Sequence, residues 1–106
     1  MKVKKEVIMR QIEAIMREKT SLLENFLPQE ESDLKFYEEN RAQIAELLES
    51  DALEDDETVF FAELTLRYSE DFIFIKRMLI ACLKSSLKAY ERYEKGLMEL
   101  LERFPE

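Results

Sequence analysis

The stretch that decides the fold is FIFIKRMLIACL, residues 72–83, in which ten of twelve residues are apolar. It is well short of the roughly 18 apolar residues that a helix needs to span a bilayer. It lies within a longer run, residues 59–104, whose only glycine is Gly96 and which contains no proline. Such a run predicts helix, and as one straight helix it would be about 69 Å long.

Two apolar rows follow the helix expected over residues 70–103 at spacings of three and four. The first row, with Ser86 and Ala89 as its small positions, contains Phe72, Ile75, Leu79, Cys82, Tyr93 and Leu100. The second row contains Ile73, Ile80, Leu83, Leu87, Tyr90, Leu97 and Leu101. Two rows need two sets of partners, so residues 72–83 predict either the centre of a bundle or a face that another chain covers.

The first half of the chain predicts two further helices. Over residues 3–26 one helix face carries Ile8, Ile12, Ile15, Leu22 and Phe26, and Lys19 interrupts it. Pro28 either ends this helix or opens the next, expected over residues 29–49. That second helix carries Leu34, Tyr37, Ile44 and Leu48 on one face, with Arg41 on the same row.

Residues 49–58 contain six carboxylates and no basic residue, and they predict the main turn of the chain. After the turn, Ser69 followed by Glu70 and Asp71 resembles a helix start. We therefore expect a short helix over residues 59–67 and a long one over 70–103, with one continuous helix as the alternative. The predicted fold is all-α: a single domain, residues 1–106, forming an antiparallel helical bundle of three to four helices with a long C-terminal helix.

The composition excludes several classes of chemistry. There is no histidine, which removes histidine-based triads, imidazole zinc sites and phosphohistidine relays. One glycine leaves no phosphate-binding loop, and acidic residues 51–57 lack the glycine and ligand alternation of a calcium loop. We expect no cofactor, no metal site and no catalytic residue, so the chain is predicted not to be an enzyme.

The cellular location can also be predicted from the residues present. The single cysteine, Cys82, is expected to be a buried small hydrophobe, and its isolation suits a reducing compartment. The basic start, residues 1–5, precedes an apolar run too short for a signal peptide. The prediction is a cytoplasmic protein with no membrane contact.

Charged residues are distributed unevenly along the chain. Thirteen of its twenty-four acidic residues lie within residues 24–57, whereas residues 76–95 carry six basic ones. A stripe on the long helix is formed by Arg77, Lys84, Lys88, Arg92 and Lys95. The net charge of −8 argues against binding to nucleic acid. The stripe is therefore a solvated face or a site for an acidic protein, including a second copy of this chain.

Aromatic residues allow two interpretations. Tyr90 and Tyr93 border the basic stripe and are either core residues or interface anchors. We expect residues 60–61, both phenylalanine, to pack in the core. Phe36 and Phe74 fall off the assigned rows, and an exposed aromatic residue at either position would indicate an interface.

Three families offer short resemblances. The run EKTSLL, residues 18–23, followed by long apolar helices resembles the small acidic chaperones of flagellar and type III export. Residues 27–28 and 36–37, followed by a long helix, are similar to the helical domain of archaeal GINS replication subunits. Arg10 resembles the substrate-binding arginine of all-helical chorismate mutases, but the residues after it are out of register with that family and no catalytic role follows.

The leading hypothesis is a non-enzymatic protein–protein interaction module, acting as an adaptor, an export or assembly chaperone, or a complex subunit. It would bind a protein partner, itself or both through the long C-terminal helix. The predicted partner-binding residues are Phe72, Ile73, Ile75, Arg77, Ile80, Lys84, Lys88, Tyr90 and Arg92. The alternatives are a nucleic-acid-associated subunit that uses the basic stripe and a small all-helical enzyme.

Overall fold

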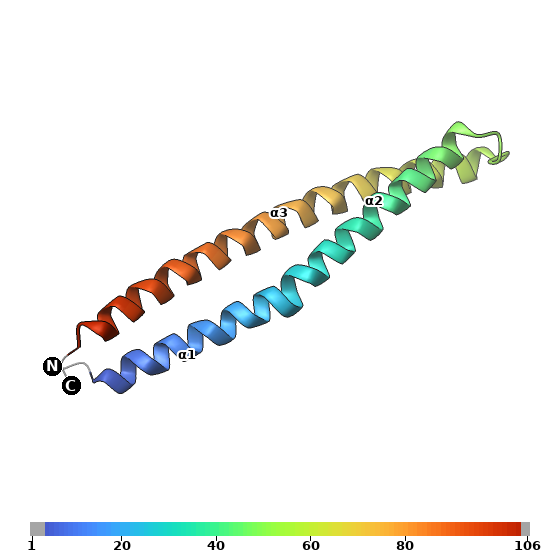
Figure 1. Ribbon diagram of the computed structural model, residues 1–106. Helices are drawn as coiled ribbons and strands as arrows, with labels where there is room; N and C mark the ends of the chain where they lie inside the picture. The colour runs from blue at the N-terminus through green and yellow to red at the C-terminus, as the bar shows by residue number, and fades with distance from the viewer. Residues whose placement is uncertain (1–3, 105–106) are drawn as a thin grey trace. The chain divides into compact units, whose positions relative to one another are not determined.

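The computed structural model describes residues 4–104, and all regular secondary structure in that part of the chain is helical (Figure 1). The elements in order are α1 (Lys5–Ser21), the π-helical turn η1 (Leu22–Phe26), α2 (Leu27–Glu49) and α3 (Asp56–Glu102). They form two compact units. Unit 2 is Gln29–Ile80, and unit 1 comprises the described parts of residues 1–28 and 81–106. The all-α class is confirmed, and the single domain expected from the length stays a prediction.

Unit 2 is a pair of antiparallel helical segments, α2 and the first half of α3, joined by the acidic turn at residues 50–55. Asp55 ends the turn: one of its carboxylate oxygens accepts the amide N–H of Glu57 at 3.2 Å, and the other accepts the hydroxyl of Thr58 at 3.3 Å. These contacts satisfy donors in the first turn of α3, where a helix has none of its own acceptors. The predicted turn is confirmed.

Unit 1 pairs α1 with the second half of α3, and α1 begins at the same end of this unit at which α3 finishes (Figure 1). The buried residues of α1 and η1 are Ile8, Ile15 and Leu22, which are all on the predicted face. Lys19 lies on that face too, and its ammonium contacts the Glu94 carboxylate of α3 at 3.4 Å. The interruption in the apolar row is therefore half of an ion pair across the unit. Of the helix predicted over residues 3–26, residue 3 lies outside the described part of the chain.

The third helix is continuous, and the expected restart near Ser69 is wrong. Ser69 is buried within α3 with 4% exposure, in line with Ile73, Lys76 and Ile80 at spacings of four, three and four. Its small side chain faces inward, so it serves as a close-packed position and not as a cap. The acids that follow it are exposed and do not mark a helix start.

A register shift occurs at η1. The amide of Leu27 donates to the carbonyl of Leu22, five residues earlier, where an α-helix would use a four-residue step. Pro28 follows at once, and its ring excludes an α-helical contact with the carbonyl four residues before it. The extra residue rotates the chain, so Phe26, predicted on the inward face, is 60% exposed and Leu27 is partly buried in its place.

Candidate protein-binding surface

The two apolar rows of α3 have different environments. The second row faces inward: it includes Ile73 and Ile80, which are buried, and Leu83, Leu87 and Tyr90, which are partly buried. The first row is exposed along its length. In each unit, one helical segment lies against α3, and this covers only one of the two rows.

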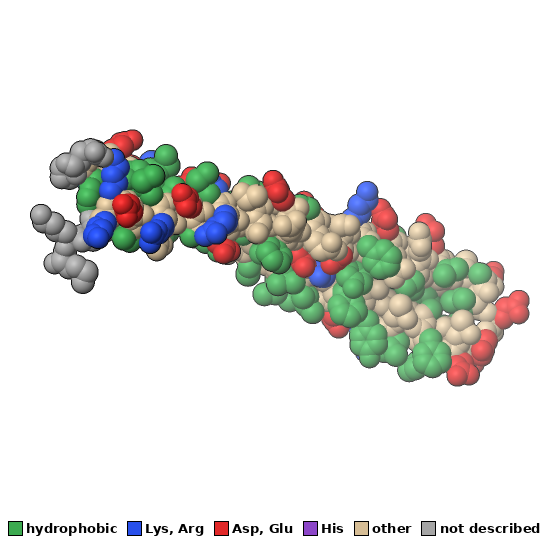
Figure 2. Space-filling view, turned by 90° about the horizontal axis from the view of Figure 1, so that it is seen from below, with side chains coloured by type: hydrophobic (Ala, Val, Ile, Leu, Met, Phe, Trp, Pro, Cys, Tyr) green, Lys and Arg blue, Asp and Glu red, His purple; other side chains and the backbone are tan. Residues whose placement is uncertain are grey.

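We call the exposed row in unit 2 the large row. Its members are Phe61, Thr65, Tyr68, Phe72, Ile75 and Leu79. Phe72, Ile75 and Leu79 are 46%, 48% and 42% exposed. Apolar side chains that alternate at three and four on one helix face are the pattern by which helices pack on one another. Figure 2 shows hydrophobic side chains gathered on one face, most densely over unit 2.

Aromatic rings of α2 extend this face. The ring of Tyr37 stacks on Phe72 with centroids 5.1 Å apart, and Phe36 meets Tyr37 edge to face at 5.5 Å. Phe36 is itself 62% exposed. It is one of the two aromatic residues whose exposure was expected to indicate an interface. The other, Phe74, is exposed as well, but it lies outside the large row, beside Arg41 and Glu70.

We call the exposed row in unit 1 the small row. Its members are Cys82, Ser86, Ala89, Tyr93, Gly96 and Leu100. The prediction that Cys82 is buried is wrong, because this face of α3 has no covering helix in unit 1. Of the two interpretations of Tyr93, a core position is excluded, since the side chain is 54% exposed. A Cβ atom built on Gly96 meets no other atom within 4 Å, so no contact within the described chain requires glycine there.

The basic stripe is exposed, and it is divided between the units. In unit 2, Arg77 approaches the Glu38 carboxylate at 3.8 Å. In unit 1, Lys88, Arg92 and Lys95 line a shallow depression with Glu91. Among the described residues Lys84, Lys88 and Arg92 form no ion pair within 4 Å, so their charge is directed to solvent.

The nine predicted partner-binding residues therefore separate into three groups. Phe72 and Ile75 belong to the large row, and Ile73, Ile80 and Tyr90 face inward. The charged members, at positions 77, 84, 88 and 92, are exposed. Leu79 and Tyr68 share the large row and were left out of the prediction. The signal that identifies them is their spacing: Tyr68 lies four residues before Phe72, and Leu79 lies four residues after Ile75.

A groove on the other side of unit 2 carries charged groups. It is lined by Glu38, Arg41, Glu70, Ile73, Phe74 and Arg77. The Arg41 guanidinium donates to the Glu70 carboxylate at 3.3 and 3.4 Å, and both side chains are about half exposed. Paired charges that are open to water are poorly suited to acid–base chemistry, which requires groups held in distinct, desolvated environments.

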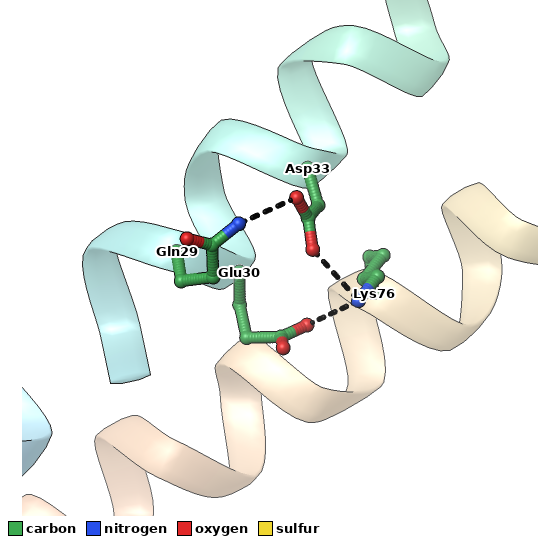
Figure 3. A network of polar contacts seen from close by, with 4 residues as sticks. All are labelled: Gln29, Glu30, Asp33 and Lys76. Carbon is green, nitrogen blue, oxygen red and sulfur yellow. Dashed lines mark hydrogen bonds and ion pairs between the residues drawn. The ribbon is translucent and has the colours of Figure 1, made fainter. Parts of the chain in front are cut away.

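One polar network holds the two segments of unit 2 in register (Figure 3). The Lys76 ammonium donates to Glu30 at 2.8 Å and to Asp33 at 3.1 Å, and Gln29 donates to the other oxygen of Asp33 at 2.9 Å. The hydrogen bonds from Lys76 and then Gln29 lower the pKa of Asp33. Those to Glu30 and Asp33 raise the pKa of Lys76. All four side chains serve the packing of α2 on α3.

Two further observations concern residues 4–104. No group of three or more acidic or cysteine side chains in this part of the chain is arranged to hold a metal ion. No helix within it combines the length and apolar character needed to cross a membrane.

Comparison with known proteins found no matching family model, no similar curated protein and no similar solved structure. The three short sequence resemblances gain no support from these comparisons.

Proposed function

We propose that this protein is a non-enzymatic helical interaction module, an adaptor, assembly chaperone or complex subunit, that binds a protein partner through α3. The observation that carries the proposal is the large row. Its five apolar members, at positions 61, 68, 72, 75 and 79, are 42–54% exposed, although the inward row of the same helix is already packed. Contiguous exposed apolar surface of this kind is typical of a protein-binding face.

The predicted bundle of three to four helices belongs to this proposal. Each unit contains two helical segments, so a bundle requires further helices from a partner laid on the exposed row. Such packing would bury Phe72, Ile75 and Leu79 in the manner of knobs between the side chains of a facing helix. The exposed thiol of Cys82 fits the reducing cytoplasm expected from the sequence.

The proposal is tested by crosslinking in the source cells. A tagged wild-type chain is compared with Ile75→Glu/Leu79→Glu, which places two charges in the row. We expect the crosslinked products, with other proteins or with a second copy, to disappear in the variant. Phe74→Glu/Met98→Glu is the matched control, because it exchanges two exposed apolar residues of α3 outside the row. Products unchanged by Ile75→Glu/Leu79→Glu, with circular dichroism showing intact helix, would overturn the function.

The basic stripe supports a second role for charge. Lys84 and Lys88 are exposed and unpaired among the described residues, so they are free to select an acidic partner and to speed its approach. Lys84→Glu/Lys88→Glu is expected to reduce the yield of the same crosslinks while leaving the helix content unchanged. Equal yields would refute the role of charge.

Nucleic-acid binding is the alternative that the same stripe favours. Lys88, Arg92 and Lys95 lie together in unit 1, where phosphates could reach them. It is the weaker proposal because the chain as a whole carries a charge of −8. A mobility shift with an oligonucleotide at low salt that disappears as salt rises would support it.

A further inference from the structure

We propose that the partner is a second copy of this chain, bound antiparallel along α3, so that the large row of each copy packs on the small row of the other. This inference rests on the proposed function and names its partner. Each contact joins one face of unit 2 to one face of unit 1 in the partner.

The two rows have the same residue spacing. The large row follows positions 61, 65, 68, 72, 75 and 79, and the small row follows 82, 86, 89, 93, 96 and 100. Both alternate steps of three and four, which is the heptad pattern of helices that pack side by side over many turns. All twelve positions are exposed, so each row presents an open face of equal length.

The sizes of the side chains in the two rows favour one antiparallel register. An antiparallel pair centred between residues 80 and 81 places Phe72 opposite the partner's Ala89 and Ile75 opposite the partner's Ser86. Thr65 then lies opposite the partner's Gly96. Each of these layers joins a larger side chain to a small one, as does the layer of Leu79 with the partner's Cys82. The remaining two layers, Tyr68 with the partner's Tyr93 and Phe61 with the partner's Leu100, join two large side chains. A parallel pair would place each residue opposite its own copy, crowding the layer of Phe72 and leaving the layer of Ala89 underfilled.

The two units carry complementary charges. Residues 29–80 hold fifteen acidic and five basic side chains, whereas the rest of the chain holds nine and eleven. Antiparallel packing brings the acidic unit of one copy onto the basic unit of the other, and parallel packing would join acidic to acidic.

The register that matches sizes also matches individual charges. Asp71 borders the large row, three residues after Tyr68, and Arg92 borders the small row on the same side of α3, three residues after Ala89. In the register described, Asp71 faces the partner's Arg92, and the two-fold symmetry repeats the pair. A shift by one heptad would place Asp71 beside the partner's Glu99 and lose this match.

Light scattering after size exclusion tests the partner. We expect the mass of a dimer for the wild type and for Phe74→Glu/Met98→Glu, and the mass of a monomer for Ile75→Glu/Leu79→Glu. Asp71→Arg and Arg92→Asp should each raise the dissociation constant at least tenfold, and their combination in one chain should restore most of it. A wild type that is monomeric at all concentrations would overturn the homodimer. If the cellular crosslinks still depend on Ile75 and Leu79, the interaction-module function remains.

Disulfide trapping tests the direction. In a Cys82→Ser background, chains with Ile75→Cys and chains with Ser86→Cys are mixed and oxidised. Antiparallel packing predicts mainly mixed disulfides between the two variants, since residues 75 and 86 share a layer. Disulfides formed mainly between identical chains would show parallel packing and overturn the proposal.

Discussion

At the scale of single residues, the network at Lys76 shows how charge is used inside unit 2. Lys76 lies on the inward row of α3, where an apolar residue would pack equally well, and it meets two carboxylates of α2. A half-buried group of ion pairs of this kind contributes little net stability. It does disfavour other alignments of α2 on α3, because a shift of α2 would leave the Lys76 ammonium unpaired. We infer that the network fixes the register of α2 on α3.

The stability of unit 2 should fall in acid because of Asp33. The pKa of Asp33 is lower in the folded state than in the unfolded state. Its carboxylate therefore stabilises the fold fully above the unfolded-state pKa of about 4, and this stabilisation is lost as the pH drops through the lowered folded-state pKa. Lys76, whose pKa is raised, stays charged throughout and loses its contribution only in strong alkali. We expect Asp33→Asn to unfold at a lower urea concentration than the wild type at pH 7, and we expect this difference in the urea midpoint to shrink as the pH is lowered below about 4.

Asp51→Asn is the matched control, because Asp51 is exposed in the acidic turn. It should leave the urea midpoint at pH 7 almost unchanged. An Asp33→Asn chain as stable as the wild type at pH 7 would show that the Lys76 network does not stabilise the fold.

At the scale of elements, the buried Ser69 distinguishes one helix from two. As an interior residue, Ser69→Ala should raise the free energy of unfolding by roughly 0.5 kcal/mol through helix propensity. As a cap, the same change would cost about 1 kcal/mol. Urea unfolding decides between them. Ser50→Ala provides the comparison, because the Ser50 hydroxyl donates to Leu47 and accepts from Ala52 at the end of α2, and its loss should destabilise.

Much of the element pattern could be predicted from the sequence. Helical periodicity and the carboxylates of residues 49–58 are local signals, and they identified the helical class and the turn correctly. The division of residues 59–103 into two helices was wrong, because Ser69 is an interior residue of α3 and not a cap. The register shift at η1 could not be predicted, because Phe26 and Leu27 are equally apolar. Their environments differ only through the step of five residues that precedes Pro28.

The surface was harder to predict than the elements. Both rows of α3 have the same spacing and similar apolar content, so the sequence could not show which row faces inward. The structure shows that Ile73 and Ile80 do, whereas Phe72 and Ile75 are exposed. Residues 60 and 61 were assigned to the core for the same reason, yet both are more than half exposed, because two segments leave much of each helix uncovered.

At the scale of the whole molecule, assembly and folding should be linked. If two copies bury their rows together, the melting temperature depends on protein concentration by mass action. A hundredfold rise in concentration should raise it by roughly 5 °C for a dimer of this size. Thermal circular dichroism measures this, and Ile75→Glu/Leu79→Glu should melt at the same temperature at every concentration. A wild type with a constant melting temperature would contradict linked assembly.

The open position at Gly96 has an energetic meaning. Glycine inside a helix lowers its stability by about 1 kcal/mol relative to alanine. No close contact among the described residues of one copy explains why glycine stands at this position. The single copy is thus less stable than it would be with alanine at residue 96. A Gly96→Ala substitution would add a methyl group that stabilises the isolated helix but also enlarges the surface that another molecule must approach. Stability of the single copy and association with a partner therefore oppose each other at residue 96.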